Sequence, residues 1–143
     1  MTKPAIDDNT VLLNETLDLV GYMYGKLAEL PEEEKWDTQA KLRTAANETL
    51  YYLSLAVGNL EPTTTEYEWG SAHKHAYTLL TMYRFAGKRS FLELDPDILL
   101  RLSKIIDAIK RGTENAMQLS AKKDAKEMEN LRNKYALWKE AQS

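Results

Sequence analysis

The sequence of 143 residues contains no cysteine, only six glycines and four prolines, and two histidines. Without cysteine, a disulfide framework and a thiolate metal site are both excluded. The small number of glycines and prolines leaves few turn residues, which argues against a sandwich or barrel of many short strands. Because 43% of the residues are apolar, a chain of this length can fill one core, and we expect a single helical domain.

Long apolar runs are also missing, and the first ten residues are polar and acidic. A membrane-spanning helix needs about 20 predominantly apolar residues, and a secretory signal needs a basic start followed by an apolar stretch. The sequence therefore predicts a cytoplasmic protein that has no membrane contact.

The net charge of −3 hides an asymmetry between the two halves of the chain. Residues 1–70 carry 5 basic and 13 acidic side chains, whereas residues 71–143 carry 14 basic and 9 acidic ones. Acidic and basic faces can pair within a bundle or between subunits, and a basic half can also bind a polyanion. Pairing is the favoured explanation, since nucleic-acid modules are usually basic overall and the pI of this sequence is about 5.5.

Apolar residues recur at three- and four-residue spacing in four segments, as amphipathic helices require. The spacing predicts helices over 9–30, from Pro31 to Gly58, from Thr64 or Thr65 to Gly87, and from Pro96 onward. The predicted core faces consist of Leu13, Thr16, Leu17, Val20, Tyr24, Leu27 and Leu30; Trp36, Ala40, Ala46, Leu50, Leu53 and Val57, widened by Leu42, Ala45, Thr49, Tyr52 and Ala56; Trp69, Ala72, Ala76, Leu79, Leu80 and Tyr83; and Ile98, Leu99, Leu102, Ile105, Ile106 and Ile109.

Local signals mark where these helices start and end. Asp8, Asn9 or Thr10 can cap the first helix, and Asp95 followed by a proline is typical of a helix start. Gly112 is a candidate break in the last helix, although a single glycine costs only about 1 kcal/mol in a helix.

The last thirty residues carry a narrower apolar pattern than the rest of the chain. Met128, Leu131, Tyr135 and Trp138 recur at heptad spacing among many charged residues. Such a seam is typical of a helix that lies against another surface or a partner chain, and these four residues are the candidate partner interface. We therefore predict an all-α, up-down-up-down four-helix bundle with a C-terminal helical extension. The predicted divisions are a disordered N-terminus (1–8), the bundle (9–112) and the extension (113–143).

Candidates for catalysis and metal binding are few. His73 and His75 point to helix faces about 200° apart, so they cannot chelate one metal from a regular helix; we interpret one as a surface histidine and the other as a hydrogen-bonded interface histidine. Glu32, Glu33 and Glu34 lie where the first turn of a helix favours negative charge, and we interpret them as capping. No nucleophile elbow, phosphate loop or dinucleotide fingerprint occurs in the sequence. We expect a protein that is not an enzyme and that needs no metal or cofactor.

Basic residues accumulate in the third and fourth predicted helices. Lys88 and Arg89 lie next to Phe91, where two positive charges and a ring can contact a phosphate backbone and a base. The alternative is an ordinary solvated basic face. The candidate nucleic-acid-binding residues are Lys74, Arg84, Lys88, Arg89, Arg101 and Lys104.

Two stretches of the chain carry a family resemblance. These are LPEEEKWDTQAKLRTAANETLYYLSLAVG (30–58) and AHKHAYTLLTMYRFAGKRSFLELDPDILLRLSKIIDAIKRG (72–112). The first resembles the second helix of the four helix bundle proteins encoded by inserts in bacterial ribosomal RNA genes. The second resembles the third and fourth helices of their relatives, the accessory variability determinants of diversity-generating retroelements.

The accessory determinants are the better fit of the two groups. The insert-encoded proteins usually close their second helix with Asn-Ile-Ala-Glu-Gly, whereas this chain has Ser54 to Gly58 there and lacks the polar Asn and Glu. The resemblance implies a ring-shaped homopentamer that binds nucleic acid and a reverse transcriptase through a basic surface.

These observations give three hypotheses about function. The leading one is a non-enzymatic, homo-oligomeric adaptor of the accessory-determinant type that engages nucleic acid or a nucleic-acid enzyme. The second is a protein-interaction module that docks a partner through its C-terminal seam and does not bind nucleic acid. The third is a helical hydrolase that uses scattered carboxylates.

Overall fold

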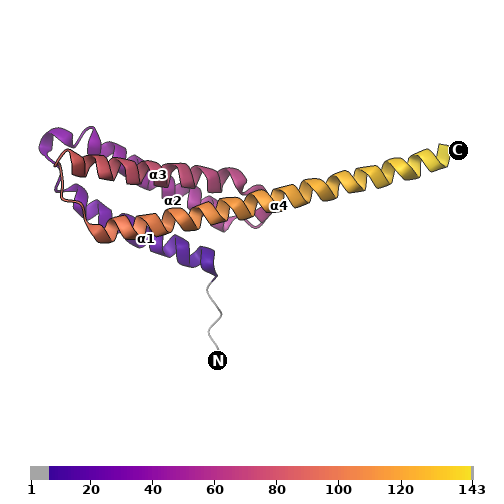
Figure 1. Cartoon of the computed structure of the whole chain (residues 1–143), viewed down its shortest axis with the longest axis horizontal. Coiled ribbons are helices and arrows are strands. Elements are labelled where there is room, and N and C mark those ends of the chain that lie inside the picture. The colour runs from indigo at the N-terminus through magenta and orange to yellow at the C-terminus, as the bar shows by residue number, and fades with distance from the viewer. Residues whose placement is uncertain (1–6, 143) are drawn as a thin grey trace, which may run out of the picture.

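The computed structural model describes residues 7–142, which form four α-helices and two 3₁₀ turns without any strand (Figure 1). Of the expected disordered segment 1–8, residues 1–6 lie outside the described residues. The all-α helical bundle with a long C-terminal helix is confirmed. Its elements are α1 (Asp8–Leu27), η1 (Glu32–Glu34), α2 (Thr38–Gly58), η2 (Pro62–Thr64), α3 (Glu66–Lys88) and α4 (Pro96–Gln142).

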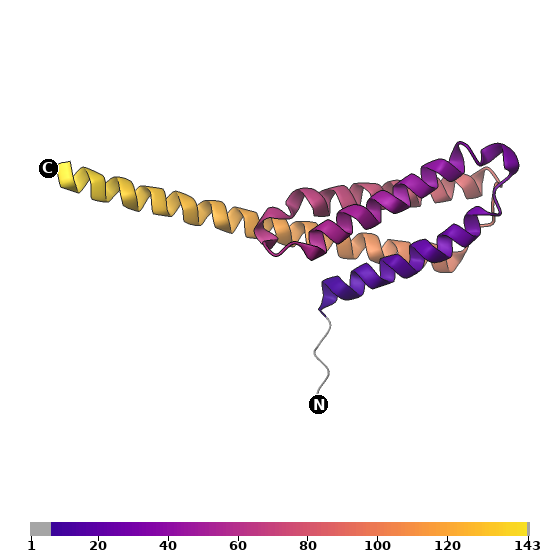
Figure 2. The ribbon, with the colours of Figure 1, turned by 180° about the vertical axis from the view of Figure 1, so that it is seen from behind.

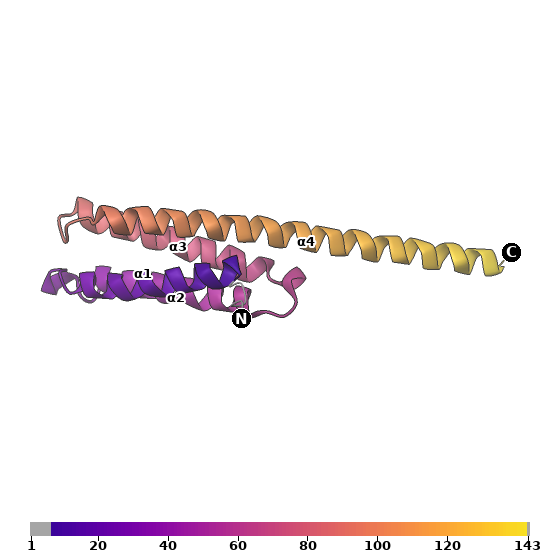
Figure 3. The same cartoon turned by 90° about the horizontal axis from the view of Figure 1, so that it is seen from below.

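The helices pack as two layers, α1 beside α2 and α3 beside α4 (Figure 3). The contact between α2 and α3 is the most extensive, and α1 closes the bundle against α2 and α4. Burial of apolar side chains from all four helices drives this packing. The most deeply buried large side chains are Leu19, Leu42, Leu53, Leu79, Tyr83, Ile98, Leu102 and Ile109.

The cap of the first helix lies one residue before the predicted caps, and the helix itself spans Asp8–Leu27. Asp7 is the N-cap, and its carboxylate accepts a hydrogen bond from the backbone N–H of Thr10 at 2.7 Å. Leu17, predicted in the core, is half exposed, while Leu12 and Leu19 are buried. The periodicity predicted a helix here correctly, but the predicted core face is rotated about the helix axis from the face that is buried.

The prediction that the second helix starts at Pro31 is wrong. The three glutamates form η1, and α2 starts only at Thr38. The side-chain amide of Gln39 donates a hydrogen bond at 3.3 Å to the carbonyl of Leu27, which also accepts one from the backbone N–H of Leu30, so the start of α2 is tied to the end of α1. This break removes Trp36 from the helix, and its side chain is 92% exposed instead of buried.

The third helix passes through Gly87 and ends at Lys88. Ser90, at φ 59°, occupies the left-handed position of a Schellman motif: its N–H donates to the carbonyl of Gly87, and the N–H of Phe91 donates to that of Ala86. Gly87 therefore lies inside the helix. Its lack of a Cβ leaves room for the Leu94 side chain, which packs where a Cβ would stand.

The fourth helix starts as predicted at Pro96 and continues through Gly112 without a break. Gly112 is needed for packing, because a Cβ there would lie 2.5 Å from the ring of Trp69. Ala116 is the last buried residue of α4. Beyond it the helix runs past η2 as far as Lys123 and then extends alone (Figure 2).

Candidate functional site

The outward side of α3 combines basic and aromatic residues. From Trp69 to Leu92 the sequence contains no acidic residue. Helical spacing of three and four residues places the exposed side chains on one stripe, which is about 21 Å long between residues 74 and 88. We call this stripe the α3 face; it consists of Tyr67, Lys74, Tyr77, Arg84, Phe85 and Lys88, all of them exposed.

The rings of the α3 face are open to solvent, with 70% of Tyr67, 59% of Tyr77 and 46% of Phe85 exposed. Phe85 packs edge-on against Phe91 at 6.5 Å between centroids, and the guanidinium of Arg89 lies 5.6 Å from the centroid of Phe91. The expected group of Lys88, Arg89 and Phe91 therefore forms the end of this face.

Two of the six candidate nucleic-acid-binding residues lie elsewhere. Arg101 and Lys104 belong to α4 and line a groove of about 230 Å³ together with Glu15 and Asp18 of α1. The guanidinium of Arg101 is also 3.7 Å from the carboxylate of Asp97. These two cations therefore share a groove with acidic side chains of the neighbouring helix. The other four candidates, Lys74, Arg84, Lys88 and Arg89, are gathered on or next to the α3 face.

The second surface is the part of α4 beyond the bundle, residues 117–142, which we call the α4 arm. At 1.5 Å per residue it extends about 39 Å. All four predicted interface residues lie along one side of it, with 52% to 61% of each exposed. The rings of Tyr135 and Trp138 stack at 5.9 Å with an interplanar angle of 29°. This seam, Met128, Leu131, Tyr135 and Trp138, contacts no part of the bundle core.

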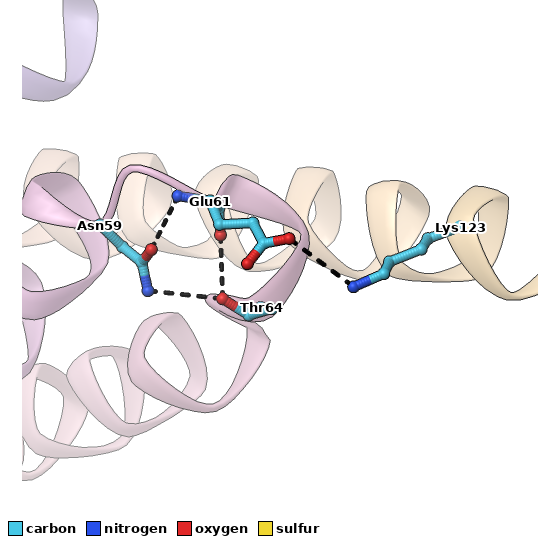
Figure 4. Close-up of polar contacts among 4 residues, drawn as sticks. All are labelled: Asn59, Glu61, Thr64 and Lys123. Carbon is cyan, nitrogen blue, oxygen red and sulfur yellow. Dashed lines mark hydrogen bonds and ion pairs between the residues drawn. The ribbon is translucent and has the colours of Figure 1, made fainter.

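The base of the α4 arm is held against the turn between α2 and α3 (Figure 4). Asn59 accepts a hydrogen bond from the backbone N–H of Glu61 at 2.8 Å, and the Thr64 hydroxyl donates to the carbonyl of Glu61 at 2.9 Å. The ammonium of Lys123 lies 3.8 Å from the carboxylate of Glu61. The turn is thus ordered locally and anchors the arm up to this lysine.

A cavity of about 360 Å³ between α2 and α3 was not predicted from the sequence. Trp36, Ala40, Thr44 and Met82 contribute to its lining, and His75 lies beside them. The His75 ring stacks on Tyr52 at 5.5 Å between centroids. Only the break before α2 could have indicated this cavity, because it places Trp36 at the rim.

A junction of titratable groups ties three helices together at the start of α4. The Asp95 carboxylate accepts hydrogen bonds from the N–H of Asp97 at 2.9 Å and the hydroxyl of Tyr22 at 3.0 Å, which lower its pKa, the backbone bond most. The N–H of Asp95 donates to the buried hydroxyl of Tyr83 at 2.8 Å, and burial raises the pKa of that tyrosine. These contacts are those of a helix cap, because each one satisfies a group at the helix start.

Residues 7–142 contain neither a cluster of metal ligands nor a helix that could span a membrane. No three histidine, aspartate or glutamate side chains there are placed to hold a metal ion. None of the helices in this part combines the length and the apolar character needed to cross a bilayer. Comparison with family models, with curated proteins and with solved structures gives no match to this chain.

Proposed function

We propose that the protein is a non-enzymatic, homo-oligomeric adaptor that binds single-stranded nucleic acid through the α3 face. The observation that carries the proposal is the acid-free stripe of Lys74, Arg84 and Lys88 interleaved with exposed rings. Proteins that bind single strands without sequence preference combine cations along the backbone with aromatic side chains on which bases stack. The resemblance of the sequence to the accessory determinants adds a pentamer as the favoured assembly and a reverse transcriptase as a candidate partner.

The distribution of charge supports this choice of surface. The acidic excess lies in residues 1–70, which form α1, α2 and the turns up to the first turn of α3. A polyanion is repelled there and attracted by the α3 face from Lys74 onward, since Glu66 and Glu68 flank Tyr67 at the start of that face. Arg101 and Lys104 are left out of the proposed site because acidic side chains of α1 and α4 already face them.

Charge reversal on the two basic surfaces tests the proposal. One variant carries Arg84→Glu and Lys88→Glu, and the matched control carries Arg101→Glu and Lys104→Glu, so that both change the net charge by the same amount. Binding of a labelled single-stranded oligonucleotide at low salt is measured by fluorescence anisotropy. We expect at least about tenfold weaker binding for the α3 variant and little change for the control. Equal losses in both would show a response to net charge alone, and no binding by the wild type would refute the proposal.

The α4 arm favours a second candidate function, a protein-interaction module that works without nucleic acid. An exposed apolar seam on a lone helix is a typical docking element for a partner helix. The observation in its favour is the exposure of all four seam residues beyond the end of the core. Two results together would favour this function over the first. The wild type would fail to bind nucleic acid, and a variant with the charges of the α3 face reversed would still bind the protein partner.

A further inference from the structure

The side chains that border the seam of the α4 arm are mostly basic. In heptad terms Met128 and Tyr135 occupy a positions and Leu131 and Trp138 occupy d positions. The e and g positions beside them hold Glu127, Arg132, Lys134 and Lys139. The acidic residues Glu129 and Glu140 lie on the side of the helix opposite the seam, since successive residues are rotated by about 100°. A helix that docks on the seam therefore meets three positive charges and one negative charge.

Pairing of the seam with the arm of a second copy gains nothing from these charges. In a parallel pair each Glu127 faces the Arg132 of the second arm, but each Lys134 then faces its Lys139. In the antiparallel pair that brings Leu131 against Tyr135, the two Arg132 side chains approach each other, and so do the two Lys134 side chains. Like charges at these positions oppose association.

The bundle of the same chain cannot cover the seam either. The α4 helix is continuous from Pro96 to Gln142, and its last buried residue is Ala116. The arm points away from the other three helices along the long axis of the molecule (Figure 1). The mean direction of the seam is also turned by roughly 65° about the helix axis from that of the core residues Ile98, Leu102, Ile109 and Ala116. The occupant must therefore come from another molecule.

We propose that the α4 arm binds an acidic amphipathic helix, whose apolar a and d residues cover the seam and whose glutamates or aspartates pair with Arg132, Lys134 and Lys139. This inference rests on the docking function of the arm given above. The stacked rings of Tyr135 and Trp138, at the C-terminal end of the seam, form the anchor, because buried aromatic side chains are enriched among the residues that contribute most to the affinity of an interface. The flanking charges select the partner and reject a second arm.

Two synthetic helical peptides test the charge of the partner. Both carry leucine at a and d; one carries glutamate at every e and g position and the other carries lysine, so that neither peptide pairs with itself. Anisotropy of each labelled peptide is measured with the full chain. The variants are Arg132→Glu/Lys134→Glu/Lys139→Glu, Leu131→Asp in the seam, and Leu137→Asp as a matched control, since Leu137 is equally exposed on the arm but lies off the seam.

The glutamate peptide should bind the wild type at least about tenfold more tightly than the lysine peptide, and the triple variant should invert this order. Leu131→Asp should remove binding, whereas Leu137→Asp should leave it unchanged. Equal binding of both peptides would overturn the acidic partner and leave the docking function standing. Binding of neither peptide would refute both. Sedimentation measures self-association of the wild type and of the variants. If the wild type self-associates and only Leu131→Asp abolishes this, the occupant is a second copy and the proposal is overturned.

Discussion

The glycines of this protein differ in what surrounds them, and the same substitution should therefore have opposite effects at two positions. At Gly112 a Cβ would lie 2.5 Å from the Trp69 ring, whereas at Gly21 of α1 nothing lies within 4 Å. Gly112→Ala should lower the free energy of unfolding by about 1–3 kcal/mol because the ring must move. Gly21→Ala should raise it by about 0.5–1 kcal/mol because glycine loses more backbone entropy on folding. Urea unfolding measures both, and a stabilised Gly112→Ala variant would contradict the packing.

The Asp95 cap predicts a dependence of stability on pH. Its folded-state pKa is lowered by the N–H of Asp97 and the hydroxyl of Tyr22. A lowered carboxyl pKa contributes stability that is complete above the unfolded-state pKa of about 3.9 and is lost as the pH falls through the folded value. Asp95→Asn removes this titration, so between about pH 5 and pH 3 the wild type should lose more stability than the variant. Thermal unfolding at several pH values in that range measures this difference. Parallel curves of stability against pH for the wild type and Asp95→Asn would contradict the cap.

At the scale of elements, α4 serves the bundle along its first half and projects from it along its second half. Ala116 is buried, and Lys123 reaches Glu61. A chain that ends after residue 123 should unfold at the temperature of the full chain, because it keeps Lys123 and every buried residue of α4. A chain that ends after residue 112 loses the last turns over Trp69 and should be at least about 1 kcal/mol less stable. Circular dichroism melting distinguishes the two truncations, and equal loss in both would show that the arm supports the core.

The core faces of α3 and α4 were predictable from the sequence, whereas those of α1 and α2 were only partly so. In α3 and α4 the regular spacing of residues such as Ala72, Ala76, Ile98 and Ile109 shows the buried side directly. The start of α2 was not predictable, because proline followed by glutamates is also a good helix start. The choice depends on Gln39 reaching the end of α1, which is a tertiary contact.

The same limit applies to the candidate surfaces. The basic residues and the seam could be found from the sequence, because helical spacing alone places Lys74, Arg84 and Lys88 on one side of a helix. That Arg101 and Lys104 face acidic residues of α1 could not be predicted, since it depends on which helix lies beside α4. Which charged residues of two helices lie together can be predicted only when the packing of the helices is known.

For the whole molecule, the exposed apolar side chains predict an oligomer. Leu60 is fully exposed and Trp36 nearly so, and Tyr51 and Leu100 are more than half exposed on the bundle. Large apolar side chains that are exposed at several places on a bundle gain stability when a second copy covers them. Native mass spectrometry at micromolar concentration should show a homo-oligomer, with a pentamer favoured by the resemblance to the accessory determinants. A monomeric mass would contradict this prediction.

The salt dependence of nucleic-acid binding tests whether the α3 face is the nucleic-acid interface. Each phosphate contact on a single strand contributes about −0.7 to the slope of log Kobs against log salt, so three cations of the α3 face predict a slope of about −2 per bound protomer. Lys88→Glu should reduce the magnitude of this slope by about 0.7, while Lys104→Glu should leave it unchanged. A slope near zero in the wild type, or a slope that responds to Lys104 and not to Lys88, would contradict the assignment of the α3 face as the nucleic-acid interface.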